Sequence, residues 1–357
     1  MRIGGTEMVI KNLIEGSDPT IFDMSIFCIE TPIGPWGIEM QNTGVPITAT
    51  TRKLGFDKSL IFAIRKHLKA NNINIIHCHQ YTPWVYGALA ALGTKTKVIF
   101  TEHGRFYPDS STWKRKLINP VLNLFTNHVT AISKATKQAL IEFENIPAKA
   151  IEVIYNGITP LKFDAEKAKS LRKSLNIPEN HMVLGTVARF DPIKNHTMMI
   201  KSFAKVLAQQ PECTLLIVGD GEERNNIEQC IAVLGIEKNV ILVGYEPKPA
   251  EHIAIMDIFL LSSLSEGTSM TLLEAMSIGK PCVVTNAGGN PEIIDNNYNG
   301  KVTPNNNVNM FGDAILELLI DSNKLAKFSK VASDTFNKKF IAQSMNKKYE
   351  KLYLKCN

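Results

Sequence analysis

This sequence of 357 residues has no long apolar run and no closely paired cysteines. Because no stretch of about 18 apolar residues occurs, we expect no membrane-spanning helix. The N-terminus also lacks the basic and apolar segments of a secretory signal. The six cysteines are scattered, without a C-x-x-C pair or dense spacing, which argues against a disulfide scaffold. We therefore expect a cytoplasmic protein.

A large excess of charge is also absent. The formal net charge is +6 and the isoelectric point is about 8.8, too small an excess to predict nucleic-acid binding. It would favour phosphate-bearing ligands or an anionic membrane surface. Hydrophobic residues make up 44% and charged residues 21% of the chain, as in ordinary globular proteins, and the length suggests two domains.

Short β-rich apolar runs alternate with segments of helical periodicity from about residue 57 onward, which predicts parallel sheets covered on both faces. The predicted fold class is α/β, with two Rossmann-like doubly wound domains. We predict strands near residues 21–28, 73–77, 97–101, 128–132, 150–154, 183–188, 214–218, 240–243, 258–262 and 282–285. The turn at residues 155–157 is the expected boundary between domains 1–157 and 158–335, and residues 336–357 are expected to form a helix packing back across the hinge.

The beginning of the chain is unusual for such a fold. Gly4-Gly5-Thr6-Glu7 reads as a glycine turn that opens a helix, and a turn of this kind normally follows a strand. Only three residues precede it, so the first strand of the N-terminal sheet is expected to be missing. Either the true start lies upstream, or the chain is a damaged product.

The most specific motif is the segment from Ser265 to Met276, which follows a predicted strand and contains the start of a helix near Met270 and Thr271. A helix N-terminus offers unpaired N–H groups and a positive dipole end, so a phosphate can bind there without a metal. Glu266 and Glu274 are eight positions apart, a spacing that suits one carboxylate near a hexose and the other near a ribose. Taken alone, both acids could equally be ordinary loop and helix-start residues.

A second motif, residues 187–196, follows the predicted strand 183–188 and therefore lies where open α/β sheets bind ligands. The Arg189 guanidinium can grip phosphate oxygens and Lys194 can add a point charge, so together they can neutralise a leaving diphosphate. The alternative is an exposed turn with two basic residues.

Three weaker signals have competing interpretations. The segment His77-Cys78-His79 could suggest a metal site, but in a strand the two histidines share one face and Cys78 points to the other. The Gly219-Asp220-Gly221 turn lacks the third glycine of a nicotinamide site. Residues 113–125 mix basic and apolar side chains and could rest on a membrane or form a domain-surface helix, which Pro120 could interrupt.

Seven segments in order resemble the retaining glycosyltransferases of the GT-B fold, family 4 (glycosyl transferases group 1), over nearly the whole chain. These segments are Gly4 to Glu7, Thr101-Glu102-His103-Gly104, Ile132-Ser133-Lys134, Ile154 to Ile158, Arg189 to Lys194, Val218 to Gly221, and Glu266 to Glu274. The stretch 101–109 is most similar to family members that make surface polysaccharides. The resemblance implies a metal-independent enzyme without a cofactor, with two Rossmann-like domains facing a cleft.

The resemblance also implies roles for individual residues. Its donor-binding residues would be Gly4, Gly5, Arg189, Lys194, Glu266, Ser269, Met270, Thr271 and Glu274, and its catalytic residues His103 and Glu266. Arg189 and Lys194 would bind the diphosphate, Glu274 the ribose and Glu266 the transferred sugar. Family members often carry Gly-Leu-Pro at residues 269–271, where this chain has Ser-Met-Thr, so we expect the backbone contacts to be retained and the sugar pocket to differ.

The substrates implied are a nucleotide-diphosphate sugar and a glycan or lipid-linked acceptor bound by the N-terminal domain. The protein would act in the cytoplasm, with peripheral contact at the inner face of the cell membrane as a further expectation. Two alternatives remain: a nucleotide-sugar epimerase or phosphorylase on the same scaffold, and an inactive truncated remnant.

Overall fold

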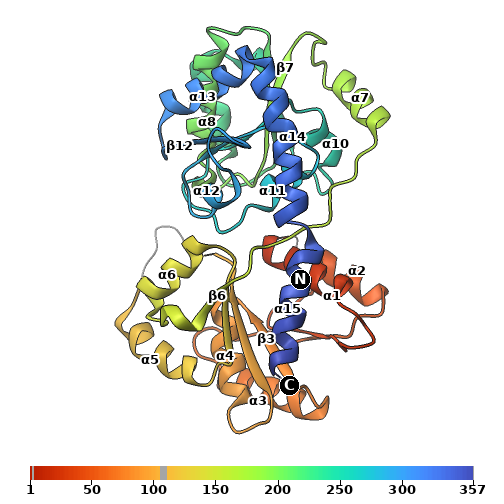
Figure 1. The fold of residues 1–357 in the computed structure, drawn as a ribbon, viewed down its shortest axis with the longest axis vertical. Helices are drawn as coiled ribbons and strands as arrows, with labels where there is room; N and C mark the ends of the chain where they lie inside the picture. The colour runs from red at the N-terminus through yellow and green to blue at the C-terminus, as the bar shows by residue number, and fades with distance from the viewer. Residues whose placement is uncertain (2–3, 105–110, 357) are drawn as a thin grey trace. The chain divides into compact units, whose positions relative to one another are not determined.

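The computed structural model describes residues 1, 4–104 and 111–356, which form two compact units (Figure 1). Unit 1 comprises Met1–Thr159 and Ala342–Asn357, and unit 2 comprises Pro160–Ile341. The chain therefore passes between units at 159/160 and 341/342, where the sequence predicted boundaries at 157/158 and 335/336. Within the described residues, no helix is both long and apolar enough to cross a bilayer.

The described residues of unit 1 form two separate parallel sheets. Strands β1 (Ile26–Cys28) and β2 (Ile47–Ala49) pair with each other, and the larger sheet has the order β3-β4-β5-β6. The strands of the larger sheet are β3 (Ile75–His79), β4 (Lys97–Glu102), β5 (His128–Ala131) and β6 (Ile151–Val153). The helices of this unit are α1 (Gly5–Gly16), α2 (Pro35–Asn42), α3 (Lys58–Ala70), α4 (Tyr81–Ala91), α5 (Trp113–Leu124), α6 (Lys134–Glu144) and α15 (Ala342–Cys356), with a 3-10 turn η1 at Ala148–Ala150.

The first described strand of unit 1 is shorter than the strand predicted at residues 21–28. Among the described residues, the first strand is β1, which covers only the last three residues of the predicted strand 21–28. Residues 18–22 instead form a turn, in which the Phe22 N–H donates to Asp18 O at 2.9 Å. Residues 2–3, which precede α1, lie outside the described part of the chain, so the expectation of a missing first strand stays a prediction.

The faces of β3 follow the predicted alternation. Cys78 points toward α4, because a Cβ on Gly87 of that helix would lie 2.4 Å from its sulfur. His77 and His79 point the other way, and the His77 Nδ1 lies 2.8 Å from the Tyr353 hydroxyl of α15. The face of the sheet toward α4 carries an apolar core that includes Trp84 and Phe100, whose rings stack with centroids 4.4 Å apart.

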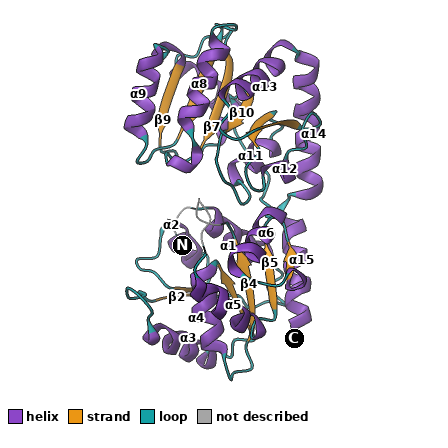
Figure 2. Ribbon diagram, turned by 90° about the vertical axis from the view of Figure 1, so that its left-hand side faces the viewer, coloured by secondary structure: helices purple, strands orange, loops and turns teal. Residues whose placement is uncertain are grey.

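Unit 2 is built on a parallel sheet of six strands in the order β12-β11-β10-β7-β8-β9, flanked by helices (Figure 2). Its strands are β7 (Met182–Val187), β8 (Cys213–Val218), β9 (Val240–Gly244), β10 (Ile258–Leu261), β11 (Cys282–Thr285) and β12 (Gly300–Thr303). Its helices are α7 (Ala165–Ser174), α8 (His196–Leu207), α9 (Arg224–Leu234), α10 (Ala250–Ala254), α11 (Met270–Ser277), α12 (Asn290–Ile293), α13 (Val308–Ile320) and α14 (Ser322–Lys339), with 3-10 turns η2 (Pro192–Lys194) and η3 (Glu237–Asn239).

The strands β8, β10 and β11 of unit 2 are buried on both faces, as their apolar sequences predict. All six residues of β8 are buried, and a core that includes Phe203 of α8 and Phe311 of α13 packs against the sheet. This order of strands is that of a doubly wound nucleotide-binding domain, in which the direction of winding reverses between the first strand and the fourth. Here the reversal lies between β7 and β10.

The C-terminal segment corrects one prediction. The sequence suggested one helix over 336–356, but α14 ends at Lys339 and α15 begins at Ala342. Phe336 is fully buried at the end of α14 in unit 2, whereas α15 packs on α1 in unit 1. There, the Asn346 Nδ2 donates to Asn12 O at 2.9 Å. The helix is interrupted where the chain leaves one unit for the other.

Candidate functional site

The strongest candidate site lies where β7 and β10 run side by side in unit 2. The two strands pair in parallel, with Ile258 opposite Leu184, and the chain leaves their carboxyl ends in opposite directions. At such a reversal the two following loops separate and leave room for a ligand. The loop after β7 carries Arg189 and Lys194, and the loop after β10 carries Glu266.

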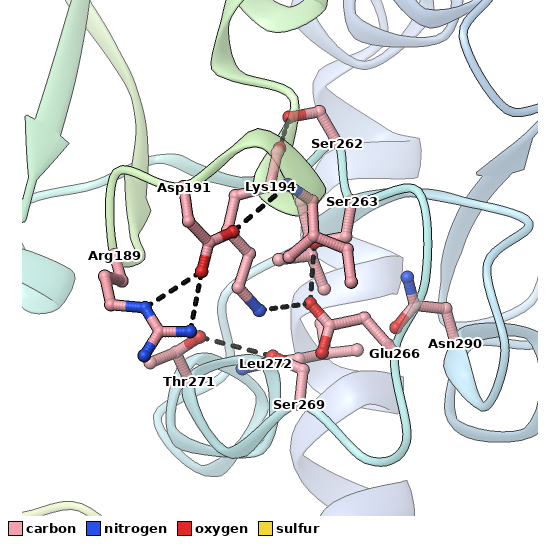
Figure 3. Close-up of polar contacts among 12 residues, drawn as sticks. Arg189, Asp191, Lys194, Ser262, Ser263, Glu266, Ser269, Thr271, Leu272 and Asn290 are labelled. Carbon is pink, nitrogen blue, oxygen red and sulfur yellow. Dashed lines mark hydrogen bonds and ion pairs between the residues drawn. The ribbon is translucent and has the colours of Figure 1, made fainter. Parts of the chain in front are cut away.

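Lys194 and Glu266 form an ion pair across this reversal (Figure 3). Lys194 Nζ lies 2.6 Å from Glu266 Oε1, and the Ser263 hydroxyl donates to the same oxygen at 2.6 Å. The side chains are 21% and 9% exposed, so the pair is largely shielded from water. Two predicted donor-binding residues, 72 positions apart in sequence, are thus brought into direct contact.

Main-chain and hydroxyl contacts hold the two loops together behind this pair. The Leu264 N–H donates to Ile193 O at 2.7 Å, and the Ser262 hydroxyl donates to Lys194 O at 2.7 Å. The Lys194 main chain ends η2, whose first turn is capped by the Asp191 carboxylate accepting from the Ile193 N–H at 3.1 Å. The loop that carries Lys194 is therefore fixed by the same strand end that carries Glu266.

Arg189 lies at the edge of the site and is paired with its neighbour. Its Nε and one terminal nitrogen contact Asp191 Oδ2 at 2.8 and 2.6 Å, and its side chain is 77% exposed. Figure 3 shows Arg189 on the same side of the site as Lys194 and Thr271. The sequence predicted Arg189 and Lys194 as a cationic pair, and in the structure each has its own acidic partner.

The loop after β8 supports the loop that carries Arg189. The Phe190 N–H donates to Asp220 O at 2.9 Å, and the Glu223 N–H donates to Phe190 O at 3.0 Å. Gly219 has a φ of +149°, and a Cβ there would lie 1.9 Å from Ala188 O, so only glycine fits this approach. The Gly219-Asp220-Gly221 turn, which lacks the third glycine of a nicotinamide site, therefore supports the Arg189 loop.

The predicted helix start at Met270 is confirmed. Ser269 is the N-cap of α11, and its hydroxyl accepts from the Leu272 N–H at 3.3 Å. The Thr271 hydroxyl lies 3.3 Å from that of Ser269. Figure 3 shows Ser269, at the start of α11, close to Glu266, and the N–H groups of a helix start suit an anion.

Glu274 is the second acid of the motif and lies in the second turn of α11. It is only partly exposed, and desolvation by burial raises the pKa of this carboxyl to about 7. A carboxylate in this position favours a ligand that brings hydrogen-bond donors, because such donors stabilise its charged form.

The remaining predicted residues belong to unit 1. Gly4 is the N-cap of α1 and Gly5 its first residue. His103 follows β4, and its Nε2 lies 2.8 Å from His79 Nδ1. Burial, with a smaller effect of His79, holds the pKa of His103 well below its usual range. Residues 105–109 of the stretch that most resembles polysaccharide enzymes lie outside the described residues.

Three contributors to the unit 2 site were missed by the sequence analysis. Asp191 anchors Arg189 and caps η2, and Ser263 donates to Glu266. The turn after β11 also packs on the Glu266 loop: the Gly289 N–H donates to Glu266 O at 3.0 Å, and a Cβ on Gly288 would lie 1.8 Å from that oxygen. The Ala-Gly-Gly sequence at residues 287–289, one residue after the predicted strand 282–285, was the signal for this turn.

Across residues 1, 4–104 and 111–356, no set of three or more His, Cys, Asp or Glu side chains is placed to hold a metal ion.

Known families and proteins match nearly all of the chain. The family described as Glycosyl transferases group 1 matches residues 167–335, and Glycosyltransferase Family 4 matches residues 3–160. Among curated proteins, N-acetyl-alpha-D-glucosaminyl L-malate synthase of Bacillus anthracis is 27% identical over 84% of this chain and 79% of its own length. The UDP-Gal:alpha-D-GlcNAc-diphosphoundecaprenol alpha-1,3-galactosyltransferase of Escherichia coli is 26% identical over 84% and 81%.

Solved structures share the fold at lower identity. A glycosyltransferase from Rickettsia africae superposes with a TM-score of 0.87 at 21% identity, covering 98% of this chain and 94% of its own. HepE of Anabaena, solved in complex with UDP, has a TM-score of 0.87 at 22% identity, covering 99% and 96%.

Proposed function

Since the chain belongs to the glycosyl transferases group 1, Glycosyltransferase Family 4, and has the GT-B fold, we propose that it transfers a sugar, with retention of configuration, from a nucleotide-diphosphate donor to a glycan or lipid-linked acceptor. The observation that carries this proposal is the Lys194–Glu266 ion pair beside the start of α11, at the reversal of the unit 2 sheet. A cation and a helix N-terminus at the carboxyl ends of parallel strands form an environment suited to a diphosphate.

In the proposed donor complex, the diphosphate lies against the first turn of α11 and is neutralised by Arg189 and Lys194. The backbone N–H groups of residues 269–271 contact the phosphate and sugar, Glu274 accepts from the ribose hydroxyls, and Glu266 accepts from the transferred sugar. Gly4 and Gly5 of unit 1 would lie beside the phosphates. The UDP complexes of Anabaena HepE, one of them with UDP-glucose, make UDP-sugars the first donors to test.

We propose that neither a metal nor a further cofactor takes part, because two cationic side chains and a helix dipole supply positive potential where the diphosphate leaves. The leaving diphosphate then accepts the proton of the attacking acceptor hydroxyl on the same face of the sugar. The glycosidic bond to the phosphate breaks and a new one forms with the acceptor oxygen. His103 and Glu266 would contact the reacting sugar.

Transfer of label from UDP-sugars tests this function, with the released UDP and the product both measured. Arg189→Ala and Glu274→Ala should abolish transfer while leaving the fold intact. Lys169→Ala and Glu222→Ala remove exposed charges from the same unit and should leave transfer unchanged. Wild-type turnover in either site variant would refute the assignment.

Strict dependence on magnesium or manganese would refute the metal-independent mechanism. A sugar epimer or sugar phosphate as the product would favour the epimerase or phosphorylase alternative.

The acceptor side of the proposal rests on α5 of unit 1. Its exposed apolar residues lie at helical spacing along one stripe, with Trp113, Leu117 and Leu124 at 70%, 65% and 79% exposure. Pro120 lies inside the helix and does not interrupt it. Lysines 114 and 116 flank the stripe, and unit 1 carries 21 Lys and Arg against 13 Asp and Glu, a net charge of +8.

An apolar helical stripe with flanking cations suits the surface of an anionic bilayer. We therefore propose that unit 1 rests on the cytoplasmic face of the membrane, where a lipid-linked acceptor is exposed. The E. coli relative acts, by its name, on a diphosphoundecaprenol-linked sugar, which supports such an acceptor.

Co-sedimentation with vesicles of phosphatidylglycerol, compared with phosphatidylcholine, tests the membrane contact. The wild type should sediment with the anionic vesicles, and the combined Leu117→Ser, Val121→Ser and Leu124→Ser variant should stay in solution. Val233→Ser with Ile320→Ser removes equally exposed apolar side chains from unit 2 and serves as the control. Equal sedimentation of all three proteins would contradict the role of α5.

A further inference from the structure

Two histidines meet at the carboxyl ends of neighbouring strands in unit 1. Strands β3 and β4 pair in parallel with His79 opposite Thr101, and His103 follows two residues later. The His79 Nδ1 and the His103 Nε2 are 2.8 Å apart, a hydrogen-bond distance. Both side chains thus lie at the sheet edge where parallel α/β domains bind ligands.

The protonation of this pair is constrained by burial. Desolvation lowers the pKa of His79 to about 3 and holds that of His103 well below its usual range. Both rings are therefore neutral near pH 7, and each carries a single N–H. One of the two facing nitrogens must donate and the other must accept, so the proton position on one ring dictates that on the other.

His79 is itself held in place from behind. The ring of His77 packs against it with centroids 4.0 Å apart. Both nitrogens of His77 are occupied, Nδ1 by the Tyr353 hydroxyl at 2.8 Å and Nε2 by the Thr101 hydroxyl at 2.6 Å. The Thr101 hydroxyl, which belongs to the neighbouring strand, thus helps to hold His77 within the sheet, and the packed His77 ring limits the rotation of His79.

The backbone directly after His79 is strained. Gln80 has a φ of +77° although it is not glycine, a conformation that is unfavourable for residues with a side chain and persists only where surrounding contacts impose it. Its N–H donates to Thr101 O at 2.8 Å, and its side-chain amide donates to the Thr6 hydroxyl in the first turn of α1 at 3.0 Å. These contacts reverse the chain at the end of β3 and fix the position of His79.

The other nitrogen of His103 has a different environment. Its Nδ1 is buried and has no hydrogen-bond partner among the described residues. A buried polar atom without a partner is costly, so such an atom at a strand end is suited to a ligand group. A sugar hydroxyl can both donate and accept, and therefore can satisfy either tautomer of His103.

We propose that His79 is a positioning residue for His103: its hydrogen bond fixes the orientation and tautomer of the His103 ring and so presents Nδ1 to a hydroxyl of the reacting sugar or the acceptor. This inference rests on the proposed transferase function for its substrate, but not for the coupling between the two rings. Nothing in the motif that marks His103 assigns a role to His79.

Three variants separate positioning from packing. His79→Leu removes the hydrogen-bonding nitrogen and keeps an apolar side chain of moderate size, whereas His79→Asn places an amide where Nδ1 lies. Tyr353→Phe removes one hydrogen bond from the same buried group without changing the His79–His103 contact. His79→Gln, whose amide lies nearer the position of Nε2, is a second variant that lacks a group at Nδ1 if the leucine protein does not fold.

We expect kcat to fall about tenfold in His79→Leu with a smaller change in KM, because one transition-state hydrogen bond is lost. The asparagine variant should recover most of this loss, and Tyr353→Phe should stay within about twofold of the wild type. A wild-type kcat in His79→Leu, or an equal loss in Tyr353→Phe, would overturn the positioning role.

A spectroscopic measurement tests the coupling without turnover. In protein labelled with 15N histidine, the ring signals of His103, assigned by their loss in His103→Gln, should report one tautomer in the wild type and a mixture in His79→Leu. An unchanged His103 tautomer would overturn the inference. If no donor is turned over by the wild type, the proposed function fails, and this measurement still decides the coupling.

Discussion

Replacing Glu274 with glutamine should make unit 2 more stable than the wild type at pH 8 and leave it nearly unchanged at pH 4.5. In the folded protein, desolvation raises the pKa of this carboxyl to about 7 from an ordinary value of 4.5. Below pH 4.5 the side chain is protonated in both states, so its favourable contribution is fully present. As the pH rises from 4.5 to 7, the unfolded chain ionises first and the contribution is lost.

The size of the effect follows from these two values. At 1.36 kcal/mol per pKa unit, the interval from 4.5 to about 7 corresponds to roughly 3 kcal/mol at most. Glu274→Gln removes the ionisation, so the stability difference between variant and wild type should grow with pH and level off above pH 7. The same variant should bind UDP more weakly, since an amide is a poorer acceptor for two ribose hydroxyls than a carboxylate.

Urea unfolding at pH 4.5, 6 and 8 measures the difference. All three tryptophans of the chain, residues 36, 84 and 113, belong to unit 1, so their fluorescence follows that unit, while far-ultraviolet circular dichroism follows both. Glu222→Gln makes the same chemical change at an exposed position of unit 2 and should show no such pH dependence. A Glu274→Gln variant that stays parallel to the wild type across this pH range would refute the reasoning.

Three further outcomes are expected. Gly219→Ala should destabilise unit 2 by about 3 kcal/mol or more and weaken UDP binding, because the added Cβ would meet Ala188 O. Gly235→Ala places its Cβ in open space and should cost about 1 kcal/mol. Thermal unfolding with and without UDP compares the two variants. Phe203→Ala should cost about 3 to 5 kcal/mol in urea unfolding, since the ring is fully buried. Calorimetric titration should show wild-type affinity for UDP rising from pH 5 to 8 as Glu274 ionises; a flat profile would contradict the ribose contact.

The layout of the strands could be predicted because most of them are continuous apolar runs. β8, buried at every residue, is the clearest case. The sequence analysis missed β2 and β12, which are only three and four residues long and contain polar side chains. Their extended conformation is imposed by pairing with β1 and β11, and such pairing partners cannot be read from a short segment alone.

The site was predictable where local chemistry defines it. Ser269 marks the start of α11 because a serine N-cap satisfies a backbone N–H of the first turn. The contact of Lys194 with Glu266 was not predictable, because it depends on which strands are neighbours at the reversal of the sheet. The contact of His79 with His103 depends in the same way on the register of β3 against β4, although the shared face of His77 and His79 was predicted correctly.

The chain enters and leaves unit 2 at adjacent points, since the Ala342 N–H donates to Ile158 O at 2.9 Å within unit 1. Unit 2 is therefore a continuous insertion whose ends are anchored side by side, a geometry that tolerates excision or exchange. Residues 160–341 could be replaced as one cassette by the matching segment of another family member, to change the donor while keeping the acceptor half. A deletion from the C-terminus would do the opposite: it would strip α15 from unit 1 and leave the inserted unit whole.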